Sequence, residues 1–443
     1  MKQRLTAVLL SLCLCLPLLS PAAGAASSFR DVPPDHWAYP DIMAMTDRGL
    51  LQGGGGAFRP GEQISKQAFL SMICRAQGLD DRKLESGADW ADPAIAYARY
   101  FGWFEDGELA DRTAPITREL AAQLLVNAFF PTALSQSGGP TFQDRGEVTP
   151  KRLPYVQAAA RLGLVNGYAD GTFRPKEGLT RAAAASLLYR SLLQNARTPG
   201  KSLQVPILMY HDISYLGRGY SKTPEVFKSQ LLELKNAGFH TVFFSQLIDY
   251  VDQGTPLPEK PIVITIDDGY ATNHTYVLPI LRDLGMKAEI SLIGDAVQYA
   301  DWGLSWDQVR EMQESGLVSF QAHTKSLHSD HSAQGGRLGV LRAPGESWNG
   351  YVELIARDTQ AELDLLERET GVRPQVFTYP RGKWNPMTEA VSAQLGCRVS
   401  LTTRDGVAAV RQNDPASLRL MDRIGMDFRN GSVVAVLKKF GYQ

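Results

Sequence analysis

Apolar positions change their spacing about halfway along the chain. Up to about residue 195 they recur at helical spacing in segments separated by glycine-rich turns, and from residue 205 onwards short apolar runs alternate with amphipathic stretches. This change indicates two kinds of domain. A chain of 443 residues also exceeds what one hydrophobic core normally serves, so we expect a multidomain protein.

The second half is predicted to be an α/β domain with a mostly parallel sheet, because its strands and helices alternate regularly. About seven strands over about 240 residues favour a barrel over an open sheet. The predicted strands are Val205–Tyr210, Thr241–Phe244, Ile262–Ile266, Ala288–Ile293, Val318–Ala322, Val376–Tyr379 and Val399–Thr402.

The first half repeats itself with a period of about 55 residues, which is a stronger signal than local propensity. Phe29-Arg30-Asp31 leads through a helical stretch to Ala57-Phe58-Arg59-Pro60, and Phe142-Gln143-Asp144 leads in the same way to Thr172-Phe173-Arg174-Pro175. A degenerate copy with Trp90-Ala91-Asp92 lies between them. Each copy is predicted to be a helix, a glycine-rich turn and a second helix.

The second helix of each copy begins with a basic residue. Thr117 and Thr180 suit the N-cap position, and Arg118 and Arg181 follow in the first turn. A basic residue gains nothing from the helix dipole there. We therefore expect these residues to join the exposed backbone N–H groups in holding an external anion.

These phrases resemble the S-layer-homology repeat, with its G-x-x-D-G-T-F-x-P stretch and T-R-A-E helix start. The resemblance implies three repeats (28–80, 81–135 and 140–195) in an all-α unit that binds an anionic secondary wall polymer through Lys66, Arg118 and Arg181. Residues 196–203 are predicted to be a linker, because they include Pro199-Gly200.

The N-terminus predicts export. Lys2 and Arg4 precede an apolar run from Leu5 to Leu19, and Ala23-Gly24-Ala25 fits a signal-peptidase site, so residues 1–25 are predicted to be a signal peptide. An uncleaved membrane anchor is the alternative. No later run is long enough to cross a membrane, so no transmembrane segment is expected after cleavage.

Charge and cysteine content narrow the class of protein. With 46 basic and 47 acidic residues, the chain gives no reason to expect nucleic acid or an anionic membrane as partner. Cleavage would leave Cys74 and Cys397 far apart in apolar surroundings, so both are predicted to be core residues rather than a disulfide.

Candidate chemistry follows the predicted strands of the second half, where barrels place functional residues. Asp267 and Asp268 end one strand, and His323 and His328 follow another. Because adjacent residues leaving a strand point in different directions, one carboxylate can bind a metal while the other accepts a proton from water. Two histidines and one carboxylate are the three ligands of a catalytic zinc-type site.

Thr265-Ile266-Asp267-Asp268-Gly269, His323 with His328, and Phe377-Thr378-Tyr379-Pro380 resemble the first three motifs of NodB-type polysaccharide deacetylases, carbohydrate esterase family 4. The histidine spacing of five is similar to the poly-N-acetylglucosamine deacetylase branch. The resemblance covers residues 204–443 and implies a distorted (β/α)7-type barrel.

The resemblance also implies roles for single residues. Asp268, His323 and His328 would hold a divalent metal, Zn²⁺ with Co²⁺ or Ni²⁺ as alternatives, and Asp267 would be the general base. A backbone N–H near Tyr379 would help the metal to stabilise the oxyanion. The side chains of Tyr379 and Trp384 would pack against a sugar ring.

Two departures from the family pattern leave questions open. Thr378 stands where many relatives carry the arginine that orients the catalytic Asp, and Arg381 or Arg404 could replace it. No histidine follows His331 to act as general acid, so Asp267 itself or His211 would return the proton, or activity would be low. His211 could equally be a core histidine.

The predicted protein is a secreted enzyme of a bacterial cell wall that removes N-acetyl groups from peptidoglycan or a poly-N-acetylglucosamine type of polysaccharide. Two alternatives stay open. One is an O-acetyl esterase on a xylan-like polymer, and the other is a wall protein that binds glycan without turnover.

Overall fold

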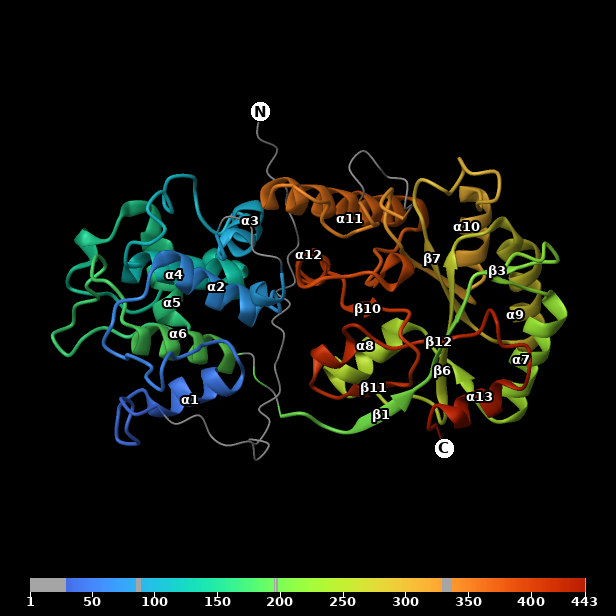
Figure 1. Cartoon of the computed structure of the whole chain (residues 1–443), viewed down its shortest axis with the longest axis horizontal. Helices are drawn as coiled ribbons and strands as arrows, with labels where there is room; N and C mark the ends of the chain where they lie inside the picture. The colour runs from blue at the N-terminus through green and yellow to red at the C-terminus, as the bar shows by residue number, and fades with distance from the viewer. Residues whose placement is uncertain (1–28, 85–88, 195, 197, 329–336, 443) are drawn as a thin grey trace. The chain divides into compact units, whose positions relative to one another are not determined.

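The computed structural model describes residues 29–84, 89–194, 196, 198–328 and 337–442, so the predicted signal peptide lies outside the described residues. The chain forms two compact units, residues 1–197 and 198–443 (Figure 1). In the described part of the chain, no helix combines the length and the apolar character that crossing a bilayer requires.

The first unit is built from three helix pairs, as the repeat predicts. The second helices of the pairs contact one another at the centre, and each first helix packs against the second helix of a neighbouring pair. The helices are α1 (Tyr39–Asp47), α2 (Lys66–Ala76), α3 (Asp92–Tyr100), α4 (Arg118–Phe129), α5 (Leu153–Arg161) and α6 (Arg181–Leu193).

A closed ring of backbone hydrogen bonds joins the three pairs. Ile64 N–H donates to the Leu179 carbonyl (2.9 Å), Leu179 N–H to Ile116 (2.9 Å), and Ile116 N–H back to Ile64 (3.0 Å). Each copy therefore supplies one donor and one acceptor, and all three buried residues satisfy their N–H groups only when the three copies close on one another.

Contacts between the copies also satisfy the first backbone N–H groups of the central helices α2, α4 and α6. The N–H groups of Lys66, Arg118 and Arg181 donate to the carbonyls of Ala114, Glu177 and Glu62, each in another copy. The expectation that these N–H groups hold an external anion is therefore wrong, because the neighbouring copy has already satisfied them.

The cap predictions hold for position, and in part for bonding. Thr180 accepts a hydrogen bond from Ala183 N–H, as an N-cap residue does, and Ser65 accepts one from Ala68 N–H. Thr117 stands at the same position before α4, but its side chain makes no such bond. Cys74 and Cys397 are both buried and free, as predicted.

The second unit is an α/β domain with a curled parallel sheet. Its strands are β1 (Ser202–Val205), β2 (Ile207–Tyr210), β3 (Asp212–Ile213), β4 (Ser221–Lys222), β5 (His240–Thr241), β6 (Pro261–Asp268), β7 (Ala288–Leu292), β8 (Val318–Ala322), β9 (Val376–Thr378), β10 (Val399–Leu401), β11 (Ala408–Arg411) and β12 (Ile424–Gly425). Its helices are α7 (Pro224–Asn236), α8 (Phe244–Gln253), α9 (Leu278–Leu284), α10 (Trp306–Glu314), α11 (Trp348–Thr370), α12 (Pro386–Gln394) and α13 (Val433–Lys439).

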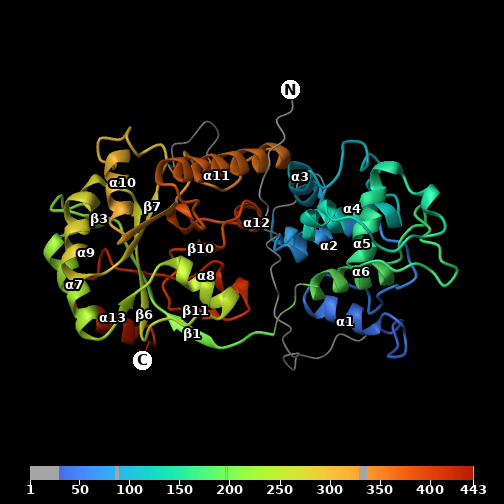
Figure 2. The ribbon, with the colours of Figure 1, turned by 180° about the vertical axis from the view of Figure 1, so that it is seen from behind.

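The sheet runs in the order β10-β9-β8-β7-β6-β2-β12, with β5 also paired to β6. All of these neighbours are parallel. A parallel bridge between Leu401 of β10 and Met421, just before β12, links the two edges of the sheet. The fold is therefore the predicted distorted barrel, with helices around it in both views (Figures 1 and 2).

Two predicted strands differ from the structure for local reasons. Pro206 has no N–H to give to a sheet ladder, so the run Val205–Tyr210 divides into β1, which pairs with β11, and β2, which pairs with β6. The run Thr241–Phe244 shares only Thr241 with the two-residue strand β5, because α8 already begins at Phe244.

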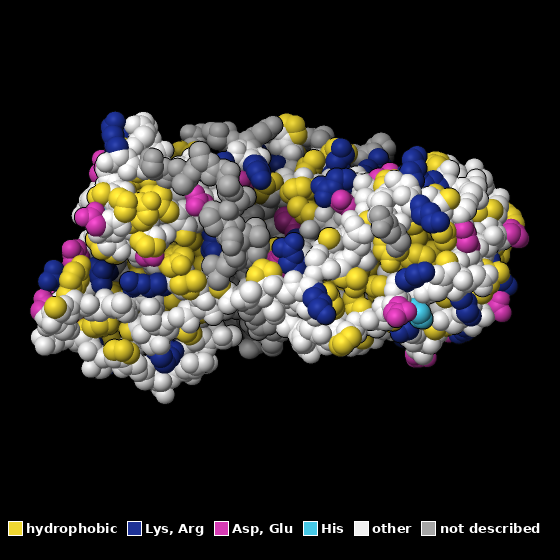
Figure 3. All heavy atoms as spheres, turned by 90° about the horizontal axis from the view of Figure 1, so that it is seen from below, with side chains coloured by type: hydrophobic (Ala, Val, Ile, Leu, Met, Phe, Trp, Pro, Cys, Tyr) yellow, Lys and Arg dark blue, Asp and Glu magenta, His cyan; other side chains and the backbone are white. Residues whose placement is uncertain are grey.

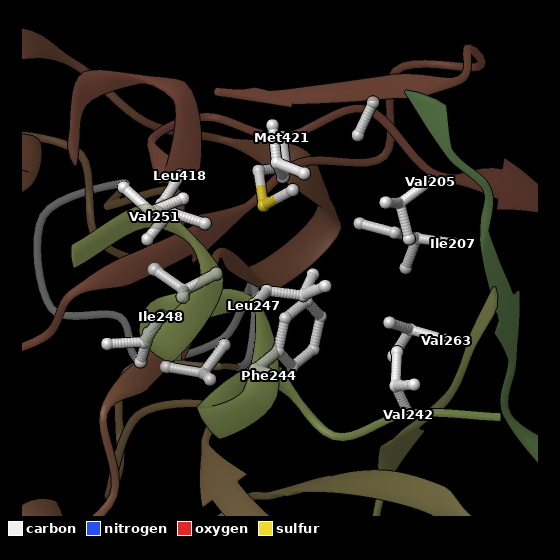
Figure 4. Packing of buried hydrophobic residues seen from close by; sticks show 14 of the residues in the cluster. Val205, Ile207, Val242, Phe244, Leu247, Ile248, Val251, Val263, Leu418 and Met421 are labelled. Carbon is white, nitrogen blue, oxygen red and sulfur yellow. The ribbon is translucent and has the colours of Figure 1, made fainter. Parts of the chain in front are cut away.

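Helix α8 fills the amino-terminal end of the barrel. Phe244, Leu247 and Val251 are fully buried and face β1, β2 and the segment before β12, as Figure 4 shows. The cluster also includes the first residues of several strands, Ile207, Val376 and Val399 among them. Because this end is packed with apolar side chains, the polar candidate residues lie at the opposite, carboxyl end of the strands.

Both units carry charges of both signs on their surfaces. On the face that Figure 3 shows, basic and acidic side chains are scattered among each other rather than gathered in one field of a single sign.

Candidate active site

The structure brings Asp268, His323 and His328 together. One ligand atom from each lies within 4.8 Å of the others, and Asp268 Oδ1 lies 3.5 Å from His323 Nε2 and 3.3 Å from His328 Nε2. Asp268 ends β6, and His323 follows β8 two strands along the sheet. The three side chains thus converge from two strand ends, that of β6 and that of β8.

This donor set fits a divalent cation of the zinc type. His323 Nδ1 is 2.7 Å from the Thr378 carbonyl, which fixes the ring and directs Nε2 towards Asp268. Two imidazoles and one carboxylate leave a position for water or substrate, as catalytic zinc sites do. Asp268 is nine-tenths buried, and although burial alone would raise its pKa, its hydrogen bonds with His323 and His328 hold it well below the ordinary value.

The backbone at these ligands is strained. Asp268 has φ +77° and Thr324, next to His323, has φ +73°, a region that non-glycine residues rarely adopt. Gly269 follows with φ +82°, and a Cβ there would lie 2.4 Å from Leu292. Asp267-Asp268-Gly269 is thus a sharp turn, which aims Asp267 and Asp268 at different partners.

Asp267 is held by Arg423, an arginine that the sequence reasoning missed. Arg423 donates to both carboxylate oxygens at 2.8 Å, and the two side chains are 0% and 2% exposed. Burial would raise the pKa of Asp267, but the charge and hydrogen bonds of Arg423 lower it overall. Arg423 also donates to the Thr402 carbonyl, so the fork cannot rotate away.

The expectation that Arg381 or Arg404 takes this role is therefore wrong. Arg404 is 63% exposed and pairs with Asp422. Arg423 immediately precedes β12 (Ile424–Gly425). The sequence offers only a basic residue between the apolar residues Met421 and Ile424, and this does not show which carboxylate the arginine meets.

His211 lies at the end of β2, beside β6 in the sheet. Its Nδ1 is 2.7 Å from Asp427 Oδ2, and 22% of its side chain remains exposed. Burial disfavours the charged imidazolium, but the hydrogen bond to Asp427 and the charges of Asp267 and Asp268 outweigh it and raise the pKa to about 9. His211 is therefore protonated at neutral pH and near the two aspartates.

Asp358 on α11 supports the loop that carries the two histidines. Its carboxylate accepts from the N–H groups of Lys325 and Ser326 (3.0 and 2.9 Å) and from the Ser326 hydroxyl (2.7 Å). Glu362, one turn later, is fully buried, and its burial and the charge of Asp358 raise its pKa well above the ordinary value. The raised pKa favours the neutral form of Glu362, which avoids a second negative charge beside Asp358.

Tyr379 does not line the site. Its side chain is fully buried, and its hydroxyl donates to Glu389 at 2.6 Å. Its own N–H donates to the Leu401 carbonyl as part of the β9–β10 pairing. The prediction that the Tyr379 ring packs against a sugar is therefore wrong, because the ring is buried. The N–H of Tyr379 itself is used by the sheet, and the predicted oxyanion contact of a backbone N–H near Tyr379 stays a prediction. Trp384 is half-buried.

In the first unit, the side chains of Arg118 and Arg181 each donate hydrogen bonds to backbone carbonyls of another copy. Arg118 donates to the carbonyls of Phe173 (2.7 Å) and Asn166 (3.2 Å), and its guanidinium stacks over the Phe173 ring. Arg181 makes the matching contacts with Phe58 (2.8 Å) and Gln52 (2.8 Å) in the first copy.

Lys66 stands at the third junction, and its neighbours differ. The middle copy has Ala110 and Asp111 where the others have Phe-Arg, so no ring lies at that position. Hydrogen bonds with Thr113 and Ala114 and the charge of Lys66 lower the pKa of Asp111. The three predicted basic residues are thus in equivalent places but in unequal surroundings.

A groove of about 380 Å³ opens beside Arg118. It is lined by residues of all three copies: Trp37, Arg118, Asn166, Gly167, Tyr168, Glu177, Gly178, Leu179, Thr180 and Ala183. Trp37 is 64% exposed. An exposed indole, a guanidinium and several backbone groups around one hollow are a surface to which a polar ligand with apolar faces can bind.

Comparison with known families agrees with this geometry. Residues 254–400 match the polysaccharide deacetylase family, and residues 28–70 and 141–185 match the S-layer homology domain. The chain therefore carries a polysaccharide deacetylase domain of the NodB type, carbohydrate esterase family 4, together with S-layer homology domains that indicate anchoring at a cell surface.

Individual relatives agree with both assignments. The poly-β-1,6-N-acetyl-D-glucosamine N-deacetylase of Escherichia coli K12 is 29% identical over 211 residues, which are 42% of this chain and 31% of that enzyme. This chain thus spans about a third of the length of that relative. The S-layer protein sap of Bacillus anthracis is 26% identical over 186 residues, 39% of this chain and 22% of that protein.

Among solved structures, a de-N-acetylase from Aggregatibacter actinomycetemcomitans aligns with 54% of this chain and 100% of its own, at 24% identity and a TM-score of 0.46.

The Asp267–Arg423 pair makes a prediction about stability. Arg423→Met should lower the free energy of unfolding by about 3–5 kcal/mol, because it leaves a buried carboxylate without its counter-charge. Urea denaturation of the full chain would measure this loss, and the double variant Arg423→Met, Asp267→Asn should recover part of it.

The matched control is Arg404→Met. Arg404 also pairs with an aspartate but is largely exposed, so its loss should cost less than about 1 kcal/mol. Equal losses from the two single variants would contradict a structural role of the buried pair.

Proposed function

We propose that this protein is a wall-anchored, metal-dependent hydrolase that removes N-acetyl groups from a cell-wall or matrix polysaccharide of the peptidoglycan or poly-N-acetylglucosamine type. The observation that carries the proposal is that Asp268, His323 and His328 lie together. Asp267 precedes Asp268 on β6. The E. coli relative is named for deacetylation of such a polymer.

We assign the metal to Asp268, His323 and His328, with Zn²⁺ as the expected ion and Co²⁺ or Ni²⁺ as alternatives. When bound there, the ion supplies Lewis-acid chemistry: it polarises the acetyl carbonyl and lowers the pKa of water in its open position.

The chain's own residues supply the proton transfers. Asp267 is a carboxylate at neutral pH because Arg423 lowers its pKa, so it can accept the proton of the attacking water. Arg423 holds both oxygens, which fixes the plane of that carboxylate. His211 has its pKa raised to about 9, which favours the protonated form, and 22% of its side chain is exposed, so it can donate a proton to the leaving amine.

We therefore propose His211 as the general acid. Like the metal ligands, His211 stands at the carboxyl end of a strand, and Asp427 orients its ring. A site with a base held ionised and an acid held protonated supports turnover more than passive glycan binding.

The testing experiment measures metal content and acetate release together. The full chain with Zn²⁺ or Co²⁺ should release acetate from N-acetylglucosamine oligomers, and a chelator should stop the release. Asp268→Ala should lose bound metal, measured by elemental analysis, and lose activity with it. Asp267→Asn should retain the metal and lose at least about a hundredfold in kcat, because only the proton acceptor has gone.

Two results would count against these assignments. Normal acetate release by Asp267→Asn would remove the base assignment. Bound metal with no release from oligomers, peptidoglycan or acetylated xylan would favour a glycan-binding wall protein, and release from xylan alone would favour an O-acetyl esterase.

The general acid predicts a pH dependence. Activity should fall as pH rises through the pKa of His211, because the neutral imidazole cannot donate. Asp427→Asn removes a hydrogen bond and a charge that raise this pKa, so the alkaline limb of the kcat/KM profile should move to lower pH. Asp405→Asn, which changes an exposed carboxylate paired with Arg429, should leave the limb in place.

We further propose that the first unit binds an anionic secondary wall polymer, with the groove beside Arg118 as the principal site. Lys66 and Arg181 occupy the equivalent places at the other two junctions. The groove supports this assignment because it combines a guanidinium with an exposed indole and lies where residues of three copies meet.

Removal of residues 28–195 should abolish sedimentation with isolated cell walls and spare acetate release from soluble oligomers.

A sharper test is Trp37→Ala, because Trp37 is exposed and its removal leaves the ring of backbone hydrogen bonds intact. Sedimentation should weaken several-fold, whereas Trp90→Ala, an exposed tryptophan in the same unit, should bind walls normally. Equal binding by both variants would place the polymer elsewhere.

A further inference from the structure

Asp427, the partner of His211, lies just beyond the end of its strand. In the described part of the chain, the pairing of β12 with β2 covers the two residues of β12, and Met426 N–H adds one bond to the Met209 carbonyl (2.8 Å). Asp427 comes next, so the sheet does not fix its side chain. Its contact with His211 therefore depends on what holds residues 427–431, which we call the Asp427 segment.

Lys222 holds the Asp427 segment from β4. Its Nζ donates to the carbonyls of Arg429 (3.1 Å) and Asp427 (3.4 Å) and to the side-chain oxygen of Asn430 (2.7 Å). Only 2% of Lys222 is exposed. The three donors of the ammonium group thus have three oxygen acceptors. Lysine is almost never buried without partners, so this set of contacts indicates a specific task.

Gln230 of α7 holds the same segment from a second side. Its amide nitrogen donates to the carbonyls of Arg429 (2.7 Å) and Gly431 (3.1 Å), and its amide oxygen accepts from the Tyr210 hydroxyl (3.1 Å). Tyr210 directly precedes His211. Gln230 therefore links the strand that leads to the histidine with the segment that carries its partner.

Lys222 makes a similar link through its backbone. β4 pairs in parallel with β3, and Lys222 lies opposite Ile213, two residues after His211. Ser214 N–H donates to the Lys222 carbonyl at 2.9 Å. Both residues thus reach from the chain around His211 to the Asp427 segment.

We propose that Lys222 and Gln230 are positioning residues for the proton donor, which hold Asp427 against His211 and thereby support proton transfer to the leaving amine. This inference rests on the proposed function, in which His211 is the general acid. Because both side chains act through Asp427, the loss of either should resemble a weaker form of the loss of the Asp427 carboxylate.

The groups around His211 determine what a titration of its ring reports. The negative charges that bear on it are Asp427 after β12 and Asp267 and Asp268 at the end of β6. From the loop between β3 and β4, the Tyr220 ring lies 6.2 Å from the His211 ring. None of these groups is altered when a positioning residue is replaced.

Lys222 could act on His211 by its charge or by its contacts, and the two predict opposite shifts. Burial lowers the pKa of Lys222 and the charge of Asp427 opposes this, so the ammonium and the carboxylate act on each other. Removal of a cation alone would raise the pKa of His211, whereas loss of the Asp427 contact would lower it.

Lys222→Met removes the three bonds and keeps a long apolar side chain. In the metal-loaded full chain, kcat for the N-acetylglucosamine hexamer should fall roughly tenfold with KM changed less than about twofold. The alkaline limb of kcat/KM should move to lower pH. Addition of Asp427→Asn should give little loss beyond that of Asp427→Asn alone, because both changes remove the same contact.

Lys235→Met is the matched control. Lys235 of α7 also donates to a backbone carbonyl, that of Leu284 at the end of α9, at 2.7 Å. Its replacement removes a bond of the same kind outside the Asp427 segment, so kcat and the alkaline limb should keep their wild-type values.

A measurement without turnover separates failure of this inference from failure of the proposed function. NMR of isotope-labelled histidine in the metal-free full chain gives the pKa of His211. This pKa should fall in Lys222→Met, as in Asp427→Asn, and should stay unchanged in Lys235→Met. Gln230→Met should shift it in the same direction and gives the answer if Lys222→Met does not fold. The result decides the inference even if the wild type releases no acetate.

Two outcomes overturn the inference. One is an unchanged or raised pKa of His211 in the folded Lys222→Met and Gln230→Met proteins. The other is a loss of kcat in the double variant equal to the product of the two single losses, which would show that Lys222 acts independently of Asp427.

Discussion

The buried pair of Asp267 and Arg423 is the contact on which the second unit depends most. It joins β6, at the middle of the sheet, to the segment just before β12, which pairs with β10 on one side and continues into β12 on the other. Closing the barrel therefore places a guanidinium on the candidate base. A buried ion pair is stable only when its hydrogen-bonding geometry compensates for the loss of solvent. Here two guanidinium nitrogens of Arg423 each donate to one carboxylate oxygen of Asp267. The interaction that closes the sheet is thus also the one that keeps Asp267 ionised.

Hydrogen bonds from neighbouring elements also hold the loop that carries two of the candidate metal ligands. His323 and His328 lie on a loop with a strained residue, Thr324, and such a loop keeps its shape only if its surroundings over-determine it. Gly294 N–H donates to the Thr324 carbonyl on one side, and Asp358 accepts from two N–H groups of the loop on the other. Fixing the ligands before the ion arrives spares the ion the cost of ordering them.

The fold class and the three candidate metal ligands could be predicted from the sequence because each prediction rested on a local pattern. Repeat phrases revealed the helix pairs, and the alternation of strands and helices revealed the barrel. Asp268, His323 and His328 could be proposed because motifs at strand ends meet at one edge of a parallel sheet.

Arg423 could not be predicted in the same way, because its role depends on which strands lie side by side. The burial of Tyr379 could not be predicted either. The motif is the same whether the tyrosine ring faces the site or packs behind the sheet. The breaks at Pro206 and Phe244 were readable in principle, from a missing N–H and from a helix start.

The first unit shows how a repeat can lose its signature and keep its fold. The ring through Ile64, Ile116 and Leu179 uses main-chain groups alone, so it places no demand on side chains beyond burial. The middle copy replaces the Phe-Arg-Pro phrase by Ala110-Asp111-Arg112, and there Arg112 donates to Asp92, whereas Asp31 and Asp144 in the other copies accept from backbone N–H groups. The copy thus preserves the link between its own turn and helix by different atoms.

It follows that closure of the unit and recognition by its grooves are separable. A junction can lose the aromatic ring and the arginine, as the one at Lys66 has, without opening the ring of backbone bonds. The fold therefore does not require three equal junctions, and the side chains at each junction set the chemistry of its surface.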